Sequence, residues 1–455
     1  MIQSPMKPWP SSAPSPTSAG CAWWPSRRRL HAILCLATRR LPGFRGARMN
    51  EKVYFLPDGL VTSPKGFVAG ATFAGMKTYT KDKLDLGILL SERPCAVAGT
   101  FTTNLIKGSS LVLTQELIER DRDRVRAVIV NSGIANACVG EHGLLDAQET
   151  VALAAAHLSL TSEEVAICST GLIGVELPMA LLRSAVPNIT LSQEGGYPFA
   201  RAILTTDRRS KSAAVQLEID GQAVTIGGCI KGSGMIHPNM ATMLAFLTTD
   251  AAVEGAYLKL VLREVVEETF NMATIDGDGS TNDTVLLFAN GEAGNAPLDA
   301  TVGGAQSFRQ ALYALCNHLC REMVRDAEGA SKIFSVEVQG ARSQEDARLL
   351  ARAVASSSLV KSAVHGNDPN WGRVIAAAGR SGAYIEEAKV NFYINDVAIM
   401  EGGTPIPFHK DSVIAIMSNP EVAFTLRLNL GEGTATAWGC ELTEEYVTFN
   451  SAYTT

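Results

Sequence analysis

Hydrophobic and polar positions along the chain repeat with two different periods. Short runs rich in Val and Ile predict β-strands at residues 127–130, 214–219 and 390–394. Longer runs with an apolar residue every three to four positions predict helices over residues 147–158, 257–270, 307–325 and 345–364. Strands and helices interleave along the sequence, and no repeat or low-complexity tract follows residue 48. The pattern therefore predicts an α/β fold.

The length of the chain, 455 residues, exceeds that of one ordinary domain, so we expect two or more domains or lobes. Hydrophobic residues make up 46% of the chain and charged residues 19%, a balance typical of a globular protein with a large core. The apolar run at residues 30–37 is too short to span a bilayer, so we expect no membrane partner.

Charge is distributed unevenly along the chain. Residues 1–50 contain eight of the 40 Lys and Arg residues and none of the 46 Asp and Glu residues. The net charge of −6 therefore becomes −14 for the remainder of the chain. So acidic a body lacks the basic surface that nucleic acid requires, and small molecules are the expected partners.

The first 48 residues are expected to be a leader outside the folded protein. They contain no acidic residue, are rich in Pro, and show no fold signature, and Met49 is the start of translation that we favour. The alternative is an organellar transit peptide, which an acid-free leader with Arg and Ser resembles but which its prolines disfavour. We therefore expect a cytoplasmic protein, with an organellar matrix as the alternative location.

Cysteine usage also favours a cytoplasmic protein. The nine cysteines are an odd number without paired spacing, which favours a reducing compartment over a disulfide framework. Cys316 and Cys320 enclose a histidine, but no second Cys or His cluster follows at zinc-finger spacing. We expect a buried helix face there and no metal site in the protein.

The segment with the most chemical information is Lys-Gly-Ser-Gly-Met-Ile-His-Pro-Asn-Met-Ala-Thr-Met-Leu at residues 231–244. A threonine hydroxyl becomes a nucleophile when a base removes its proton, and the residue's own α-amine can be that base. Cleavage between Ala241 and Thr242 would free such an amine. Small residues on the approach, such as Gly232 and Gly234, permit a strained backbone. The alternative interpretation is a buried strand that follows a loop.

The whole string resembles the cleavage segment of the ornithine acetyltransferases, the bifunctional glutamate N-acetyltransferases of arginine biosynthesis. The resemblance extends from about Val61 to Thr455. It implies that Thr242 cleaves the chain and carries the acetyl group, and that residues 49–241 and 242–455 stay associated, typically as two copies of each. It also implies lobes with α-β-β-α layers, as in self-processing N-terminal-nucleophile enzymes.

A second segment, Ile-Cys-Ser-Thr-Gly-Leu-Ile-Gly at residues 167–174, follows the strand pattern with a turn. Thr170 and Gly171 could expose a hydroxyl and a backbone N–H together, as an oxyanion hole for acyl transfer requires. The family's oxyanion pair corresponds to these two residues. Without the resemblance, a Ser-Thr-Gly sequence is most often a plain turn.

The resemblance implies five further substrate-binding residues in addition to Thr242. Thr206 lies in a Leu-Thr-Thr-Asp segment, Lys231 precedes the glycines, and Glu328 follows the helix predicted at residues 307–325. Asn450 and Thr455 belong to the C-terminal segment. Taken alone, Glu328 would be a solvated charge at a helix end and the C-terminal segment a frayed tail.

Two loops suggest ligands that their spacing excludes. The acidic loop at residues 276–287 has Thr281 where a calcium-binding EF-hand loop has Gly and Leu287 where it has Glu. We expect a polar turn beside the catalytic site instead. Residues 227–234 are rich in glycine, but Lys231 precedes Gly232, so the segment is not a phosphate-binding P-loop.

These observations predict an acyltransferase that uses a ping-pong mechanism. Thr242 would accept the acetyl group of N-acetylornithine and pass it to L-glutamate, with the α-amine, whose ordinary pKa is about 8, as base and acid. No metal or prosthetic group is expected, and whether acetyl-CoA is a second donor stays open. The alternatives are a self-processing aminopeptidase or amidase, in which water accepts the acyl group, and a non-enzymatic scaffold.

Overall fold

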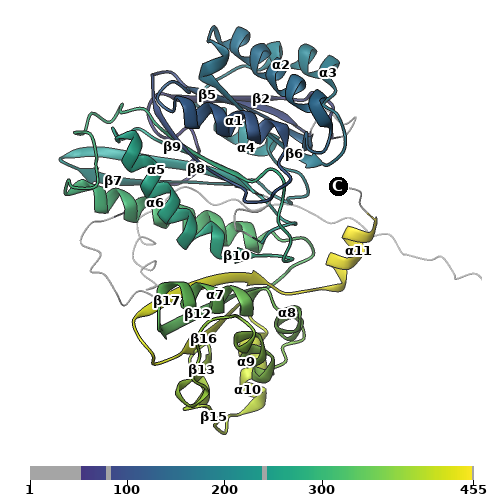
Figure 1. Ribbon diagram of the computed structural model, residues 1–455, viewed down its shortest axis with the longest axis vertical. Coiled ribbons are helices and arrows are strands. Elements are labelled where there is room, and N and C mark those ends of the chain that lie inside the picture. Colours follow the sequence, from purple (N-terminus) through teal and green to yellow (C-terminus); the bar gives the residue numbers. More distant parts are fainter. Residues whose placement is uncertain (1–52, 78–82, 238–242, 453–455) are drawn as a thin grey trace, which may run out of the picture. The chain divides into compact units, whose positions relative to one another are not determined.

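A computed structural model of the protein describes residues 53–77, 83–237 and 243–452 (Figure 1). Within these residues the strands form three sheets. The first sheet has six strands in the order β1 (Tyr54–Phe55), β7 (Lys211–Ile219), β8 (Gln222–Lys231), β9 (Leu244–Thr249), β11 (Thr284–Ala289) and β4 (Ala96–Phe101). The second has four, in the order β2 (Phe67–Thr72), β3 (Leu86–Ser91), β5 (Ala127–Ile134) and β6 (Val165–Leu172).

The third sheet is formed by the C-terminal part of the chain together with one short earlier strand. Its described strands follow the order β10 (Ala273–Thr274), β17 (Gly433–Cys440), β12 (Ile333–Ala341), β16 (Glu421–Arg427), β13 (Asn391–Ile394), β14 (Val397–Glu401) and β15 (Thr404–Pro405).

Helices alternate with these strands along the chain, as the sequence predicts. In the described residues they are α1 (Ser109–Arg120), α2 (Gly140–Leu158), α3 (Met179–Ala185), α4 (Gly196–Ala202), α5 (Gly255–Glu268), α6 (Gly304–Arg325), α7 (Gln344–Ala355), α8 (Ser358–His365), α9 (Trp371–Gly379), α10 (Lys410–Met417) and α11 (Glu444–Ala452).

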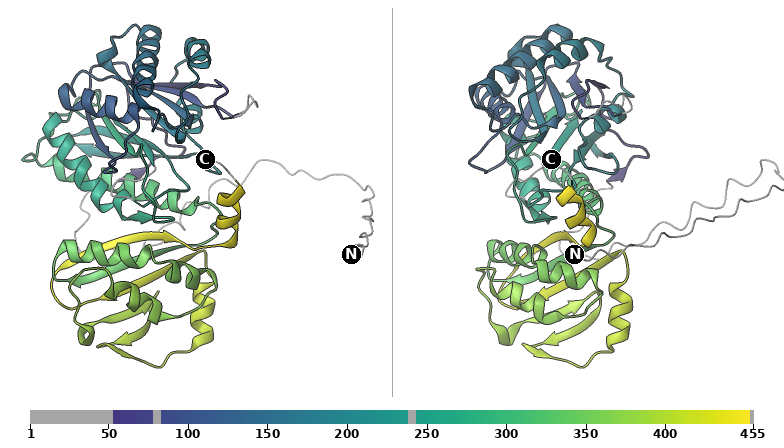
Figure 2. Two further views of the ribbon diagram at one scale, coloured as in Figure 1. Left: turned by 45° about the vertical axis from the view of Figure 1, so that its right-hand side comes forward. Right: turned by 90° about the vertical axis from the view of Figure 1, so that its right-hand side faces the viewer.

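The first two sheets form the middle of an α-β-β-α sandwich. Side chains of β2, β3, β5 and β6 pack against side chains of β8, β9 and β11 in one core between the sheets, to which α1 and α4 also contribute. On its other face the six-stranded sheet packs against α5 and α6, and the four-stranded sheet packs against α2 and α3. Figures 1 and 2 show these layers from three directions. The α/β fold class is confirmed.

The third sheet packs in a simpler way. Its main core joins alternate residues of β12, β13 and β16 to helices α7, α8, α9 and α10. The resemblance implied lobes with α-β-β-α layers. In the structure, the four layers are formed by the first two sheets and their helices. The helix predicted over residues 345–364 is wrong as one element, because α7 ends at Ala355 and α8 begins at Ser358. Ser357 has an extended backbone there, a conformation that serine adopts readily at a helix start.

Strand β9 is central to the six-stranded sheet, and all six of its residues are buried. It pairs antiparallel with β8, where Lys231 lies opposite Leu244, and parallel with β11, where Leu244 lies opposite Thr284. A strand covered on both faces can be apolar throughout, which explains its continuous Leu-Ala-Phe-Leu run. The residue before this strand, Met243, follows the predicted cleavage site directly.

Candidate active site

The predicted scissile bond, between Ala241 and Thr242, lies outside the described residues, and so does Thr455. The chain on both sides of the bond is described. It reaches His237 on the N-terminal side and resumes at Met243 on the C-terminal side. The environment of the predicted nucleophile can therefore be built from the groups that hold these two flanks.

The N-terminal flank, residues 232–237, is held by acidic residues from distant parts of the chain. The Asp207 carboxylate accepts a hydrogen bond from the Gly232 amide at 2.7 Å. The Asp276 carboxylate accepts the amides of Met235 and Ile236, the latter at 2.8 Å. Asp276, the first residue of the predicted polar turn, thus binds the backbone of the flank.

Lys231 ends β8 inside a buried cluster of charges. Its side chain donates to the Thr205 hydroxyl at 3.3 Å, and its charge acts on Asp207. Asp207 forms an ion pair with Lys211, which also pairs with Asp326 at 2.7 Å. Burial lowers the pKa of Lys231, while the negative charges of Asp207, Asp283 and Glu328 oppose that shift. Burial alone would raise the pKa of Asp207, but Lys211 and Lys231 lower it to about 2.

Three other predicted residues meet around the same flank. The Thr206 hydroxyl forms a hydrogen bond with the Ser233 hydroxyl at 2.7 Å. The Glu328 amide donates to the Ser233 carbonyl at 2.9 Å, and the Glu328 carboxylate accepts the Asn450 amide group at 2.9 Å. Glu328 lies in the turn after α6, and Asn450 lies on α11. The structure thus brings Thr206, Lys231, Glu328 and Asn450 into one neighbourhood.

Gly234 lies in close contact with the carboxylate of Glu328. A Cβ atom built on Gly234 would lie 2.6 Å from a carboxylate oxygen of Glu328, closer than real side chains approach. The small residue at position 234 lets this carboxylate lie against the backbone, although the Glu328 side chain is flexible enough to move aside for a larger residue.

The predicted oxyanion pair lies at the end of β6, beside the end of β5. Thr170 is buried, and Gly171 opposes Gly133 of the neighbouring strand. Gly171 has φ +131°, and a Cβ atom there would lie 2.2 Å from the Gly133 carbonyl carbon. Only glycine fits this position, because both the backbone angle and the contact exclude a side chain.

Asn282 connects the oxyanion pair to the C-terminal flank of the predicted bond. Its amide group donates to the carbonyl of Ser169, the residue before Thr170, at 3.0 Å and to the Ala135 carbonyl at 2.6 Å. The next residue, Asp283, accepts the Met243 amide at 2.7 Å. Sequence reasoning recognised residues 276–283 as a turn near the site but assigned no role to Asn282 or Asp283.

Lys77 is a second residue that sequence reasoning missed. Its ammonium group donates to the carbonyls of Leu84, at 2.9 Å, and Ala202, at 3.4 Å. Burial lowers its pKa to about 8, although Asp85 and Asp207 act in the opposite direction. A Cβ atom built on Gly133 would touch the Lys77 side chain at 2.9 Å, so this lysine lies close to the predicted oxyanion pair.

The described residues also show where ligands are not held. They contain no group of three or more His, Cys, Asp or Glu side chains placed to bind a metal ion. Cys316 and Cys320 are buried on α6, which confirms the helix-face interpretation. In the same part of the chain, no helix combines the length and the apolar character that a membrane crossing requires.

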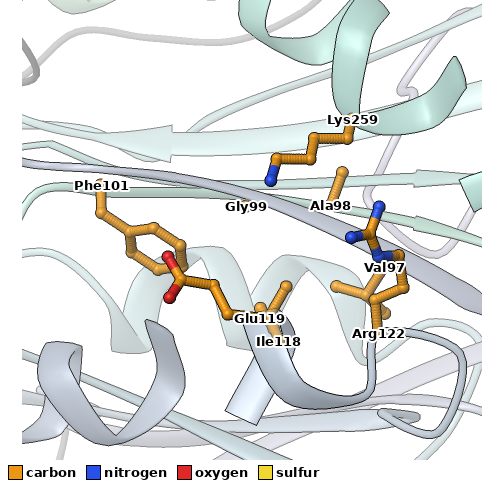
Figure 3. Close-up of a pocket in the computed structure, with 8 residues that line it drawn as sticks. All are labelled: Val97, Ala98, Gly99, Phe101, Ile118, Glu119, Arg122 and Lys259. Carbon is orange, nitrogen blue, oxygen red and sulfur yellow. The ribbon is translucent and has the colours of Figure 1, made fainter. Parts of the chain in front are cut away.

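A small pocket lies away from the predicted residues, between β4, the end of α1 and α5 (Figure 3). Its volume is about 50 Å³, which is room for one or two water molecules and too little for an amino acid. Its lining includes Glu119, Arg122 and Lys259. The pocket shares no residue with the cluster around Lys231.

The layered fold and the charged cluster define an α/β protein with a buried polar site at one end of the six-stranded sheet. The family follows from comparison with known proteins. The ArgJ family model matches residues 68–455, and the chain belongs to this family. The resemblance to the ornithine acetyltransferases is thereby confirmed, and the prediction of an acyltransferase is confirmed at the level of the family.

Individual relatives align over most of the chain. The arginine biosynthesis bifunctional protein ArgJ of Dehalococcoides mccartyi is 46% identical over 90% of this chain and 100% of its own length. The protein of the same name from Symbiobacterium thermophilum is 49% identical over 87% of this chain and 99% of its own. A crystal structure of ArgJ from Bacillus halodurans is 37% identical, covers 46% of this chain and 98% of that chain, and has a TM-score of 0.45.

Proposed function

We propose that the protein transfers the acetyl group of N2-acetyl-L-ornithine to L-glutamate within arginine biosynthesis, the process in the printed names of its relatives. The observation that carries this proposal is the opposition of charges beside the predicted nucleophile. The buried cation of Lys231 suits an α-carboxylate, and the carboxylate of Glu328 suits an α- or side-chain ammonium group. Both substrates carry these two groups.

The proposed reaction has two halves. The Thr242 hydroxyl attacks the acetyl carbonyl carbon while its α-amine takes the proton, and the developing oxyanion is stabilised by Thr170 and Gly171. Collapse breaks the C–N bond, and ornithine leaves with that proton on its amine. In the second half the amine of glutamate attacks the acetyl-threonine ester, and Thr242 regains its proton. Asn450, Thr206 and Thr455 are proposed to hold the substrate.

We further propose that the Thr242 hydroxyl attacks the Ala241 carbonyl, so that the Ala241–Thr242 amide becomes an ester and the Thr242 amine is freed. Water then hydrolyses the ester, which restores the hydroxyl and gives chains of residues 49–241 and 242–455. The three amides held by Asp207 and Asp276 support a constrained backbone before the bond. Assembly as two copies of each chain and a cytoplasmic location are parts of the same proposal.

Steady-state assays test the proposed reaction. Purified protein is given acetylornithine with glutamate, acetyl-CoA with glutamate, or acetylornithine alone, and acetylglutamate and free acetate are measured. Acetylglutamate from the first mixture supports the proposal, and its formation from the second mixture adds acetyl-CoA as a donor. Release of acetate without acetylglutamate would show a hydrolase and overturn the proposal.

A further inference from the structure

The two amino acids of the proposed reaction carry opposite charges at the ends of their side chains. Ornithine ends in an ammonium group, whereas glutamate ends in a carboxylate. Lys231 and Glu328 account for an α-carboxylate and for an ammonium group. Neither accounts for the second carboxylate of glutamate, which needs a cation of its own to be bound tightly. The acceptor therefore requires one more positive group than the donor does.

Lys77 is a half-buried cation in a loop whose backbone is fixed. The buried carboxylate of Asp85 accepts the amides of residues 74–76 at 2.6, 2.9 and 2.6 Å. The ammonium group of Lys77 donates to the backbone carbonyls of Leu84, at 2.9 Å, and Ala202, at 3.4 Å. Both of these acceptors are uncharged, so they orient the ammonium group without neutralising it.

The charges around Lys77 favour the binding of an anion. Asp85 and Asp207 act on its ammonium group, but Asp85 binds backbone amides and Asp207 forms an ion pair with Lys211. Burial lowers the pKa of Lys77 to about 8, which leaves the group mostly charged at neutral pH. The like charge of Lys231 also acts on it. A ligand with two carboxylates would relieve the repulsion between these two lysines.

Lys77 lies between two parts of the candidate site. On one side, its side chain contacts the backbone at Gly133, the glycine opposite the predicted oxyanion pair, where an added Cβ atom would lie 2.9 Å away. On the other side, the Ala202 carbonyl that accepts its ammonium group ends α4. The turn after this helix contains Thr205, which accepts a hydrogen bond from Lys231. The same short segment thus contacts both lysines.

We propose that Lys77 binds the γ-carboxylate of the acceptor glutamate and thereby selects this amino acid in the second half of the reaction. The inference rests on the proposed function. Lys231 holds the α-carboxylate, so the two lysines bind the two carboxylates of one molecule. Acetylornithine has no second carboxylate, and the first half of the reaction does not use the contact. A lysine that only supported the fold or the oxyanion would serve both halves equally.

The test compares the two substrates in Lys77→Gln, which keeps a donor for the backbone carbonyls and removes the charge. In a ping-pong mechanism, kcat/KM for each substrate reports its own half of the reaction. Loss of a charge-assisted hydrogen bond should lower kcat/KM for glutamate about 30-fold. The value for acetylornithine should stay within about twofold. A fall of the same size for both substrates would overturn the inference.

A second acceptor makes the test independent of the overall activity. L-glutamine has the shape of glutamate without its γ-charge, so the unsubstituted protein should prefer glutamate by about 10²-fold in kcat/KM. In Lys77→Gln this preference should shrink to about threefold, because no cation remains to distinguish the two acceptors. A preference that stays the same in the variant would show that another group reads the γ-carboxylate.

Lys332→Gln is the matched control. Lys332 is also half-buried, and its ammonium group also donates to backbone carbonyls, those of Val364 and His365, both at 3.3 Å. This variant should keep the preference of the unsubstituted protein for glutamate over glutamine. An equal loss of preference in both variants would mean that the effect is not specific to Lys77, and the inference would fail.

Lys77→Met takes the place of the glutamine variant if that protein does not melt cooperatively, with the same expected change in preference. If neither variant folds while Lys332→Gln does, Lys77 serves the fold and the inference is overturned. Absence of acetylglutamate with the unsubstituted protein would instead overturn the proposed function.

Discussion

A buried aspartate lies at each end of strand β9. Asp250 follows the strand, and Asp283, which precedes β11, binds the residue before β9. The two carboxylates differ in their hydrogen bonds. At the C-terminal end, each oxygen of Asp250 accepts a backbone amide. At the N-terminal end, Asp283 uses one oxygen for the Met243 amide, and within the described residues its other oxygen has no partner. Burial raises the pKa of both carboxyl groups. Burial and the direction of the pKa shift therefore do not distinguish the two aspartates, whereas their hydrogen bonds do.

The two ends of β9 also differ in the number of charged groups around them. Lys231, with Asp207 and Lys211 beyond it, makes the N-terminal end a network of buried charges. Near Asp250, the charged group that acts on the carboxylate is Lys65. A concentration of buried charge is costly for folding. Its presence at one end is therefore better explained by a catalytic or binding role than by a contribution to stability.

The largest effect on activity is expected when the predicted nucleophile, near the N-terminal end of β9, is removed. Thr242→Ala should give an uncut chain with turnover lower by about 10³-fold or more, because no hydroxyl is available for either reaction. Intact mass measurement reports the cut, which in the unsubstituted protein should release a fragment of 214 residues, Thr242 to Thr455. Thr242→Ser keeps a hydroxyl and should be cut in part. An alanine variant with normal turnover would exclude Thr242 from the mechanism.

The next effect concerns the oxyanion pair on β6. Thr170→Ala should lower kcat by about 10² while KM for acetylornithine changes little, because the contact is made mainly in the transition state. Steady-state kinetics on the cut enzyme measure both constants. Thr150→Ala is the control, since Thr150 is a buried threonine that bonds within α2. A raised KM with unchanged kcat would place Thr170 in ground-state binding.

Stability should respond strongly at the charged end of β9. Asp207→Ala leaves Lys211 and Lys231 short of a buried partner and should lower the free energy of unfolding by about 3 kcal/mol, measured by urea denaturation. Asp411→Ala, at an exposed position on α10, should change it by less than about 1 kcal/mol. Equal effects of the two substitutions would contradict this role of Asp207.

Asp207 also predicts a pH dependence with a definite sign. Its folded pKa of about 2 lies below the ordinary value, so its contribution is fully present above about pH 4 and is lost as pH falls toward 2. The free energy of unfolding of the unsubstituted protein should therefore decrease in that window more steeply than that of Asp207→Ala. Parallel curves would show that the carboxylate has no such effect.

The smallest effect is expected at the other end of the strand. Asp250→Asn leaves one oxygen to serve two amides, so one amide loses its partner at a cost of about 1–2 kcal/mol. Thermal unfolding measures this loss, and kcat should not change. A clear fall in kcat would show that this end of the strand also acts in turnover.

Periodicity predicted the fold where single elements are long or strongly apolar. The predicted helix at residues 307–325 is α6 to within three residues, and the predicted strand at 214–219 is the main part of β7. The pattern failed at residues 356–357, where the helix ends and a new one begins. The apolar residues keep the same spacing on both sides of these two serines, so the break is not visible in the pattern. Which strands become neighbours is set by tertiary packing, and the sequence pattern alone did not indicate the three sheets.

The candidate site was predicted unevenly. Lys231, Glu328 and Asn450 were found through the resemblance, and the structure brings them together from β8, the turn after α6, and α11. Asp283 and Lys77 were missed because a lone aspartate or lysine in a sequence carries no information about its burial. The alternation of acidic residues at 276–283 drew attention to calcium, although the useful signal was the position of Asp283 immediately before a buried strand.

The order of strands in the first sheet has a consequence for any cut at the predicted bond. Strands β9 and β11 would belong to the second fragment, while β8 on one side and β4 on the other would belong to the first. Strands of the two fragments would thus alternate within one sheet, and their side chains would share one core. Separating them would require global unfolding, so dilution alone should not dissociate the cut chains.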